Sequence, residues 1–114
     1  MTILIDNYDS FTFNVYQCLL SAGAKNVRVL RNDEVQIDEL IALKPQQLLI
    51  GPGPGRPEQA GISLKAVEHF AGKIPIMGIS LGHLVIAEAF GGKTQAARNI
   101  KHGLAEEINL DGKG

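Results

Sequence analysis

Short apolar runs alternate along the chain with segments whose apolar residues recur every three or four positions. The apolar runs predict buried strands at residues 2–5, 27–30, 47–50 and 74–79. The segments that follow each run predict helices at residues 11–22, 37–43, 62–70 and 81–90. Glycine or proline stands where these helices must end, at Gly23, Pro45, Gly72 and Gly91.

This alternation of strand and helix favours a parallel sheet that carries helices on both faces. We therefore predict an α/β fold with a flavodoxin-like, open and mostly parallel sheet. The helix predicted at residues 81–90 is apolar nearly all round, so we expect it to be buried. No internal repeat or linker is visible in residues 1–114, which indicates one domain.

The sequence from residue 93 onward is less regular. Residues 93–97 and 105–110 are candidates for short strands, and Asp111-Gly112 is a two-residue hairpin signal. The sequence stops two residues after this turn, before a second strand. We therefore expect that the sequence is cut and leaves an exposed sheet edge through which the chain associates with itself or with its partner. The alternative is a frayed tail.

Composition narrows the class of protein. Hydrophobic residues make up 45% and charged residues 20%, as in ordinary soluble globular proteins. The net charge is −1 with no basic run, which argues against nucleic-acid binding. No apolar stretch approaches a membrane span, the chain opens on a strand-like run instead of a signal peptide, and Cys18 is the one cysteine. We expect a cytoplasmic protein with no metal, cofactor, nucleic-acid or membrane partner.

Ligands of open parallel sheets bind beyond the carboxyl ends of the strands. Of the segments expected there, residues 78–83 are the most informative, because a strand runs into a tight turn and an apolar helix leaves it. Ser80 lies at this turn, and the flanking glycines permit the strained backbone of a nucleophile elbow. The helix start would also stabilise an oxyanion. The alternative is an ordinary turn with a serine helix cap.

A glycine-proline loop, residues 51–55, follows the third strand. We do not expect it to bind phosphate, because Pro52 and Pro54 lack N–H donors and no Lys-Ser or Lys-Thr pair follows. The N–H groups of Gly53 and Gly55 suit a neutral carbonyl instead. The alternative is a rigid connector between strand and helix.

Four stretches of sequence keep a characteristic order and spacing. They are Asp6-Asn7-Tyr8-Asp9-Ser10-Phe11-Thr12, the Gly51 to Gly55 loop with Glu58 and Ala60-Gly61-Ile62-Ser63, Leu81-Gly82-His83, and Ala89-Phe90-Gly91-Gly92-Lys93. Together they resemble the glutaminase subunit of anthranilate and aminodeoxychorismate synthases, over essentially the whole chain. Members of this family are class I (triad) glutamine amidotransferases.

The resemblance implies that glutamine is hydrolysed through a thioester on a cysteine, and that ammonia passes to a chorismate-using synthase of tryptophan or folate biosynthesis. Ser80 occupies the nucleophile position. Gly53, Gly55 and the backbone N–H of Leu81 would bind glutamine and its oxyanion. Leu84 stands where the family has a glutamine that lines the substrate pocket.

Departures from the family pattern predict weak or absent activity. Ser80 replaces cysteine and Leu84 replaces glutamine, whereas the replacement of a common serine by Gly51 is minor. Residues 1–114 resemble the N-terminal part of the domain, without the region that carries the family's catalytic histidine and glutamate. His83 matches a family histidine that is not the base, and we expect it to be buried and structural. A serine hydroxyl has no accessible anion and needs a general base, whereas a thiol at a helix start forms a thiolate near neutrality.

Two other functions remain open. If the chain keeps the fold but does not hydrolyse glutamine, it is an inactive binding or regulatory module for the synthase. Alternatively it is a serine hydrolase, since Gly78-Ile79-Ser80-Leu81-Gly82 fits the G-x-S-x-G elbow. We rank the hydrolase low, because its acid and histidine would have to follow Ser80 within a short remaining sequence.

Overall fold

Strand and helix alternate in the computed structural model, which describes residues 1–95 of the chain. The strands are β1 (Thr2–Asp6), β2 (Val27–Arg31), β3 (Gln47–Ile50) and β4 (Ile76–Gly78). The α-helices are α1 (Thr12–Ser21), α2 (Ile37–Ala42), α3 (Ser63–Phe70) and α4 (Leu81–Ala89), and a 3₁₀ turn is η1 (Pro57–Gln59). The predicted order is confirmed, although β4 is shorter than predicted at both ends.

The strands of this region form one parallel sheet in the order β2-β1-β3-β4. Ile5 lies between Leu30 and Ile50 in the sheet, and Ile50 lies beside Gly78. This order matches the flavodoxin-like arrangement of a doubly wound sheet, so the predicted fold class is confirmed. Because the strands are parallel, the loops that follow them meet at one end of the sheet.

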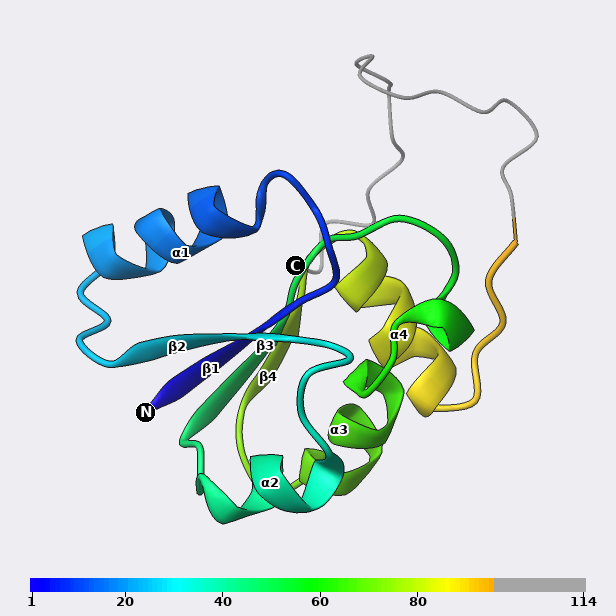
Figure 1. The fold of residues 1–114 in the computed structure, drawn as a ribbon. Helices are drawn as coiled ribbons and strands as arrows, with labels where there is room; N and C mark the ends of the chain where they lie inside the picture. Colours follow the sequence, from blue (N-terminus) through cyan, green and yellow to red (C-terminus); the bar gives the residue numbers. More distant parts are fainter. Residues whose placement is uncertain (96–114) are drawn as a thin grey trace, which may run out of the picture.

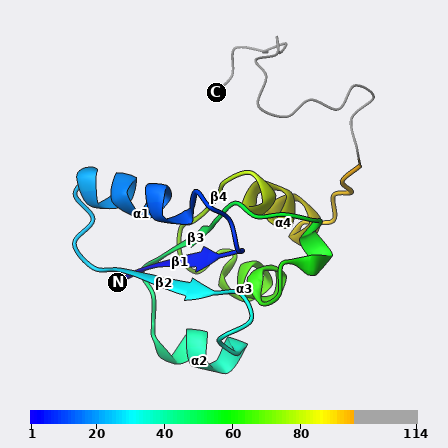
Figure 2. The same cartoon turned by 45° about the horizontal axis from the view of Figure 1, so that its top comes forward.

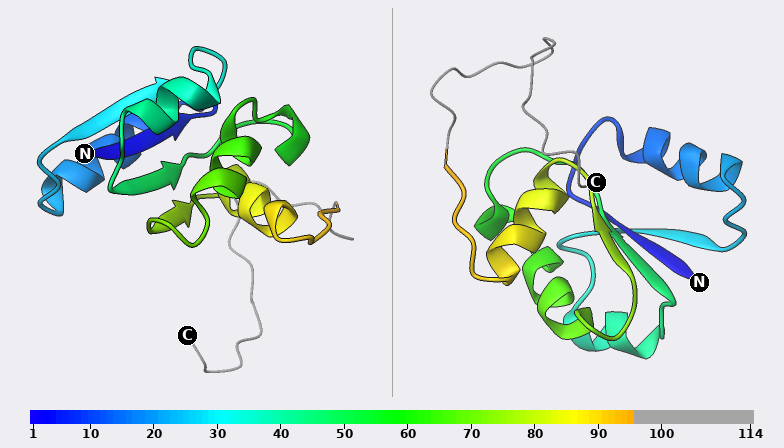
Figure 3. Two further views of the ribbon diagram at one scale, coloured as in Figure 1. Left: turned by 90° about the horizontal axis from the view of Figure 1, so that it is seen from below. Right: turned by 180° about the vertical axis from the view of Figure 1, so that it is seen from behind.

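Helices cover both faces of the sheet. α1 lies on one face, and α2, α3 and α4 lie on the other (Figures 1 and 2). The view from behind in Figure 3 shows the strands between α1 and the pair α3 and α4. α3 turns Ala66, Val67 and Phe70 inward, which follows from their spacing of one, three and four positions.

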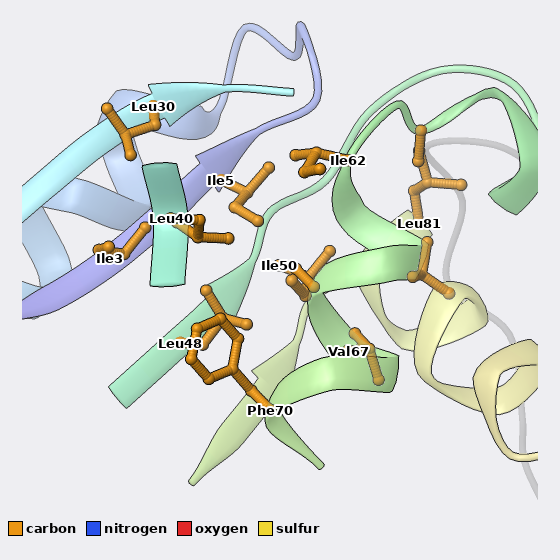
Figure 4. Packing of buried hydrophobic residues seen from close by; sticks show 13 residues of the cluster. Ile3, Ile5, Leu30, Leu40, Leu48, Ile50, Ile62, Val67, Phe70 and Leu81 are labelled. Carbon is orange, nitrogen blue, oxygen red and sulfur yellow. The ribbon is translucent and has the colours of Figure 1, made fainter. Parts of the chain in front are cut away.

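The main hydrophobic core fills the space between the sheet and α2, α3 and α4. Alternate strand residues point into it, because successive side chains of a strand face opposite sides. Ile3, Ile5, Leu48 and Ile50 are all fully buried there. Figure 4 shows these side chains gathered with those of the helices, among them Leu40, Val67, Phe70 and Leu81.

The opposite face of the sheet is less completely covered. Leu4 and Leu49 are buried on it, but Met77 of β4, the edge strand among the described residues, is 60% exposed. A groove of about 280 Å³ opens there, lined by residues that include Leu19 of α1, Leu49 and Met77. α1 buries only Thr12 completely, so it covers this face loosely.

Two expectations from the sequence need correction or qualification. α4 is not buried all round: Leu81, Gly82 and Val85 are buried, whereas Phe90 at its end is 71% exposed. One side of α4 packs on the sheet, and no other described element covers its outer side. In the region predicted as a strand at residues 93–97, Lys93 to Gln95 have no regular structure. The predicted strand 105–110 and the Asp111-Gly112 turn lie outside the described residues.

Candidate functional site

The three candidate segments meet beyond the carboxyl ends of the strands, at the upper end of the sheet in Figure 1. The loop of residues 7–11 follows β1, the glycine-proline loop follows β3, and the turn at Ser80 follows β4. β3 and β4 are neighbours, and Ile50 pairs with Gly78. The glycine-proline loop and the Ser80 turn therefore start side by side.

Ser80 has an unusual backbone conformation. Its φ is +55° and its ψ is −114°, although most residues with positive φ are glycine. Its side chain is exposed and makes no capping hydrogen bond to α4. The alternative of a serine helix cap is therefore wrong. The backbone has the strained strand-to-helix turn of a nucleophile elbow.

Glycines make this turn possible. A Cβ on Gly82 would overlap the carbonyl oxygen of Ile50, and a Cβ on Gly78 would lie 2.5 Å from the carbonyl of Gly82. The N–H of Ile79 donates to the carbonyl of Ile50 at 3.0 Å, which ties the turn to β3. The elbow is therefore held against the end of β3 by contacts that only glycine allows.

The start of α4 offers a backbone donor. The N–H groups of Gly82 and His83 donate to Ile79 and Ser80, and that of Leu84 also donates to the Ser80 carbonyl. Within residues 1–95, the N–H of Leu81 is the one first-turn donor with no such acceptor. It lies at the positive end of the helix dipole, where it suits a developing oxyanion.

The glycine-proline loop is buried at its start and exposed at its tip. Gly51 is buried, Gly53 is intermediate and Gly55 is exposed with φ +80°. A Cβ on Gly55 would lie 2.5 Å from the side-chain oxygen of Gln59. That oxygen also accepts the N–H of Arg56 at 2.9 Å, which closes the loop onto η1. The loop is therefore held at both ends.

Two side chains near Ser80 are more open than the sequence indicated. His83 is exposed, so the expectation of a buried structural histidine is wrong. Leu84, one turn after Ser80, is 36% exposed and does not belong to the hydrophobic core. Both lie on the outer side of α4, whose opposite side packs on the sheet.

Sequence reasoning missed a group of buried polar residues beside these loops. They are Asp6, Asn7, Thr12, Asn32 and Ser63. Asp6 accepts hydrogen bonds from the Thr12 hydroxyl at 2.8 Å and the Tyr8 N–H at 2.9 Å. The available signal was that a polar residue, Asn7 or Asn32, directly follows each of the first two strands.

Tyr8 and Glu58 carry shifted pKa values. The Tyr8 hydroxyl donates to Asp33, and this bond, with partial desolvation and the Asp33 charge, raises the pKa of the phenol. Arg31 lies over the Tyr8 ring at 5.2 Å. The pKa of Glu58 is lowered by a hydrogen bond from the backbone amide of Glu58 itself. The guanidinium of Arg56, 2.9 Å from the carboxylate, lowers this pKa further.

The described part of the chain contains no group of three His, Cys, Asp or Glu residues arranged to hold a metal ion. No helix in the same region is long and apolar enough to cross a membrane.

Comparison with known proteins matches residues 3–114 to the family described as glutamine amidotransferase class-I. The chain is 49% identical over its whole length to aminodeoxychorismate synthase component 2 of Escherichia coli, covering 60% of that protein. It is 52% identical over 99% of its length to aminodeoxychorismate/anthranilate synthase component 2 of Bacillus subtilis, covering 58% of it. The chain thus spans about 60% of the length of these relatives.

Among solved structures, the fold is similar to that of a putative GMP synthase protein from Thermoplasma acidophilum. The TM-score is 0.69 at 24% identity, over 90% of this chain and 51% of the other. At this identity the likeness concerns the fold alone.

Proposed function

The chain belongs to the class I glutamine amidotransferase family, and from this premise we propose that it is the glutaminase part of a chorismate-using synthase. In this proposal it binds glutamine, and ammonia passes to a synthase subunit that makes anthranilate or aminodeoxychorismate. The names of the similar Escherichia coli and Bacillus subtilis proteins support this choice of synthase. A cytoplasmic location belongs to the same proposal.

One observation carries the assignment of the site: Ser80 keeps the backbone of a nucleophile elbow without capping the helix. A non-glycine residue in such a conformation costs about 1–3 kcal/mol and persists only where the surrounding structure enforces it. Here the close approach of Gly82 to Ile50 enforces it. This strained conformation exposes the side chain of Ser80 beside the start of α4.

We assign each site residue a role within this proposal. Ser80 stands at the nucleophile position. The Leu81 N–H and the N–H groups of Gly53 and Gly55 would bind the glutamine carboxamide and the oxyanion formed on it. Leu84 would line the pocket with apolar surface where a polar side chain suits glutamine better.

The same assignment implies weak or absent glutaminase activity. Ser80 carries a hydroxyl, which forms no useful anion near neutral pH without a general base. A thiol at a helix start does form one, because the helix dipole lowers its pKa. General-base assistance alone contributes roughly 10²–10⁴-fold to such reactions.

Ser80→Cys tests whether the elbow is built to activate a nucleophile. We expect the introduced thiol to react with iodoacetamide at pH 7 about tenfold faster than Cys18, since lowering a pKa by about one unit raises the thiolate fraction about tenfold. Cys18 is exposed on α1 and is an internal control in the same molecule. Mass spectrometry of the alkylated peptides gives both rates. Equal alkylation rates at the two thiols would show that the elbow does not activate a nucleophile at residue 80.

Glutamine should slow alkylation of the introduced thiol and leave the rate at Cys18 unchanged. If glutamine gives no protection while the synthase partner still binds the chain, the chain is a non-catalytic binding module and the proposed glutaminase function is wrong.

A fluorophosphonate probe on the unchanged protein tests the alternative of a serine hydrolase. We expect no labelling of Ser80, and rapid labelling would favour a serine hydrolase.

A further inference from the structure

Asn7 is the centre of a buried hydrogen-bond network that the proposed chemistry does not use. The side chain is 2% exposed and lies directly after β1. Its Nδ2 donates to the carbonyl of Gly51 at 2.9 Å. Its Oδ1 accepts from Nδ2 of Asn32 and from the hydroxyl of Ser63, both at 2.9 Å. One amide thus acts as donor and acceptor at once.

The partners of Asn7 come from separate parts of the fold. Asn32 follows β2, Gly51 follows β3, and Ser63 begins α3. Asn32 and Ser63 are themselves buried. Among the described residues, no buried side-chain polar atom is left without a partner. Removing one member of such a network leaves a buried group unpaired, which costs more than the hydrogen bond itself is worth.

The backbone of Asn7 also supports the glycine-proline loop directly. A Cβ on Gly53 would overlap the carbonyl oxygen of Asn7 and lie 2.5 Å from the Cβ of Asn7. Asn7 therefore contacts the loop at two points. Its side chain donates a hydrogen bond to the carbonyl of Gly51, and its backbone packs against the α-carbon of Gly53. Pro52 lies between them with a φ that its ring restricts. These contacts restrain the loop between Gly51 and Gly53.

We propose that Asn7 is the positioning residue of the glycine-proline loop, which it sets so that the N–H groups of Gly53 and Gly55 face the site beside Ser80. This inference rests on the proposed function, because it gives those two donors glutamine as their ligand. Asn7 acts through the loop and does not touch the ligand. Displacement of donors by about 1 Å is enough to lose most of the effect of a binding or catalytic group.

Three variants of the full chain separate the contacts. Asn7→Asp removes the donor to Gly51 and keeps an acceptor for Asn32 and Ser63. Gly53→Ala leaves the Asn7 side chain unchanged and forces the loop off the Asn7 backbone. Thr12→Val is the matched control, because it removes an equally buried hydroxyl bond, to Asp6, that does not reach the loop. If Asn7→Asp fails to fold, Gly53→Ala tests the same support.

The first measurement uses ¹⁵N relaxation and amide chemical shifts of Gly53 and Gly55 without any ligand. We expect the chemical shifts of both amides to change in Asn7→Asp and Gly53→Ala. We also expect their order parameters to fall from about 0.85 towards 0.6 or lower. In Thr12→Val they should stay as in the parent protein. Unchanged loop amides in Asn7→Asp, or equal changes in the Thr12→Val control, would overturn the proposal.

The second measurement is glutamine affinity by calorimetry. We expect Asn7→Asp to bind glutamine about tenfold or more weakly than the parent chain, and Thr12→Val to bind it equally well. If the parent chain binds no glutamine but the loop amides respond as expected, the proposed function fails and the positioning of the loop stands. If the parent chain binds glutamine and Asn7→Asp binds it as tightly, the positioning role fails.

Discussion

The two faces of the sheet differ in how completely they are packed. The face towards α2, α3 and α4 contains a continuous cluster of buried apolar side chains from the strands and these helices. The face towards α1 contains an open groove of about 280 Å³, and Met77 on it is 60% exposed. We call these the closed face and the open face.

The difference shows where the site obtains its rigidity. α4 packs on the closed face through Leu81 and Val85, and this contact holds the elbow at Ser80 against β3. The outer side of the same helix, with His83 and Leu84, stays open. A backbone fixed against the sheet and exposed side chains therefore occur on one helix.

The largest expected effect comes from equal truncations on the two faces. Leu48 and Leu49 are neighbours in β3, and Leu48 belongs to the buried cluster of the closed face whereas Leu49 does not. We expect Leu48→Ala to lower the free energy of unfolding by about 2–5 kcal/mol, because its cavity is enclosed. Leu49→Ala should cost clearly less, since the space beside it already opens into the groove. Urea unfolding measures both, and equal losses would remove the distinction between the faces.

A substitution in the contact between α4 and β3 should have the next largest effect. Gly82→Ala places a methyl group against the carbonyl of Ile50, so α4 must shift away from the sheet. We expect a loss of about 1–3 kcal/mol in the free energy of unfolding. His83→Ala, on the exposed side of the same turn, is the control and should change it by less than about 0.5 kcal/mol. A neutral Gly82→Ala would mean that the elbow is not held by this contact.

Leu84→Gln concerns the open side of α4 near the site. We expect glutamine to bind about tenfold more tightly, because a buried polar group of the ligand regains a partner worth about 1–3 kcal/mol. Leu20→Gln is a matched control on α1, since Leu20 and Leu84 are 37% and 36% exposed. Calorimetry compares the two. No change with Leu84→Gln would show that Leu84 does not line the pocket.

The smallest effect on folding is expected at Met77, on the exposed edge strand of the open face. We expect Met77→Lys to change the free energy of unfolding by less than about 0.5 kcal/mol, because the side chain is already in water. The same change should weaken self-association through this edge, since charged residues on edge strands prevent pairing. Sedimentation over a concentration series tests this. A parent chain that stays monomeric at every concentration would exclude self-association through the edge.

Local sequence patterns were sufficient for the order of elements. The run at residues 47–50 has no polar residue after Gln47, so it predicted a buried strand, and β3 spans the same residues. Gly78 and Gly82 around Ser80 predicted a tight turn, because only glycine permits such close backbone contacts. Both signals act over a few residues and need no knowledge of the remaining chain.

Burial and polar contacts depended on tertiary structure. α4 is apolar on nearly every side, yet only one side of it is covered, because burial depends on which distant elements pack there. Asn7 bonds to residues 25, 44 and 56 positions away, and these pairs arise only when the parallel register brings the strand ends together. The sequence by itself determined the elements and the elbow, because these follow from spacing within a few residues. The tertiary structure decided which helix sides remain open and how the glycine-proline loop is held, because those depend on contacts between distant segments.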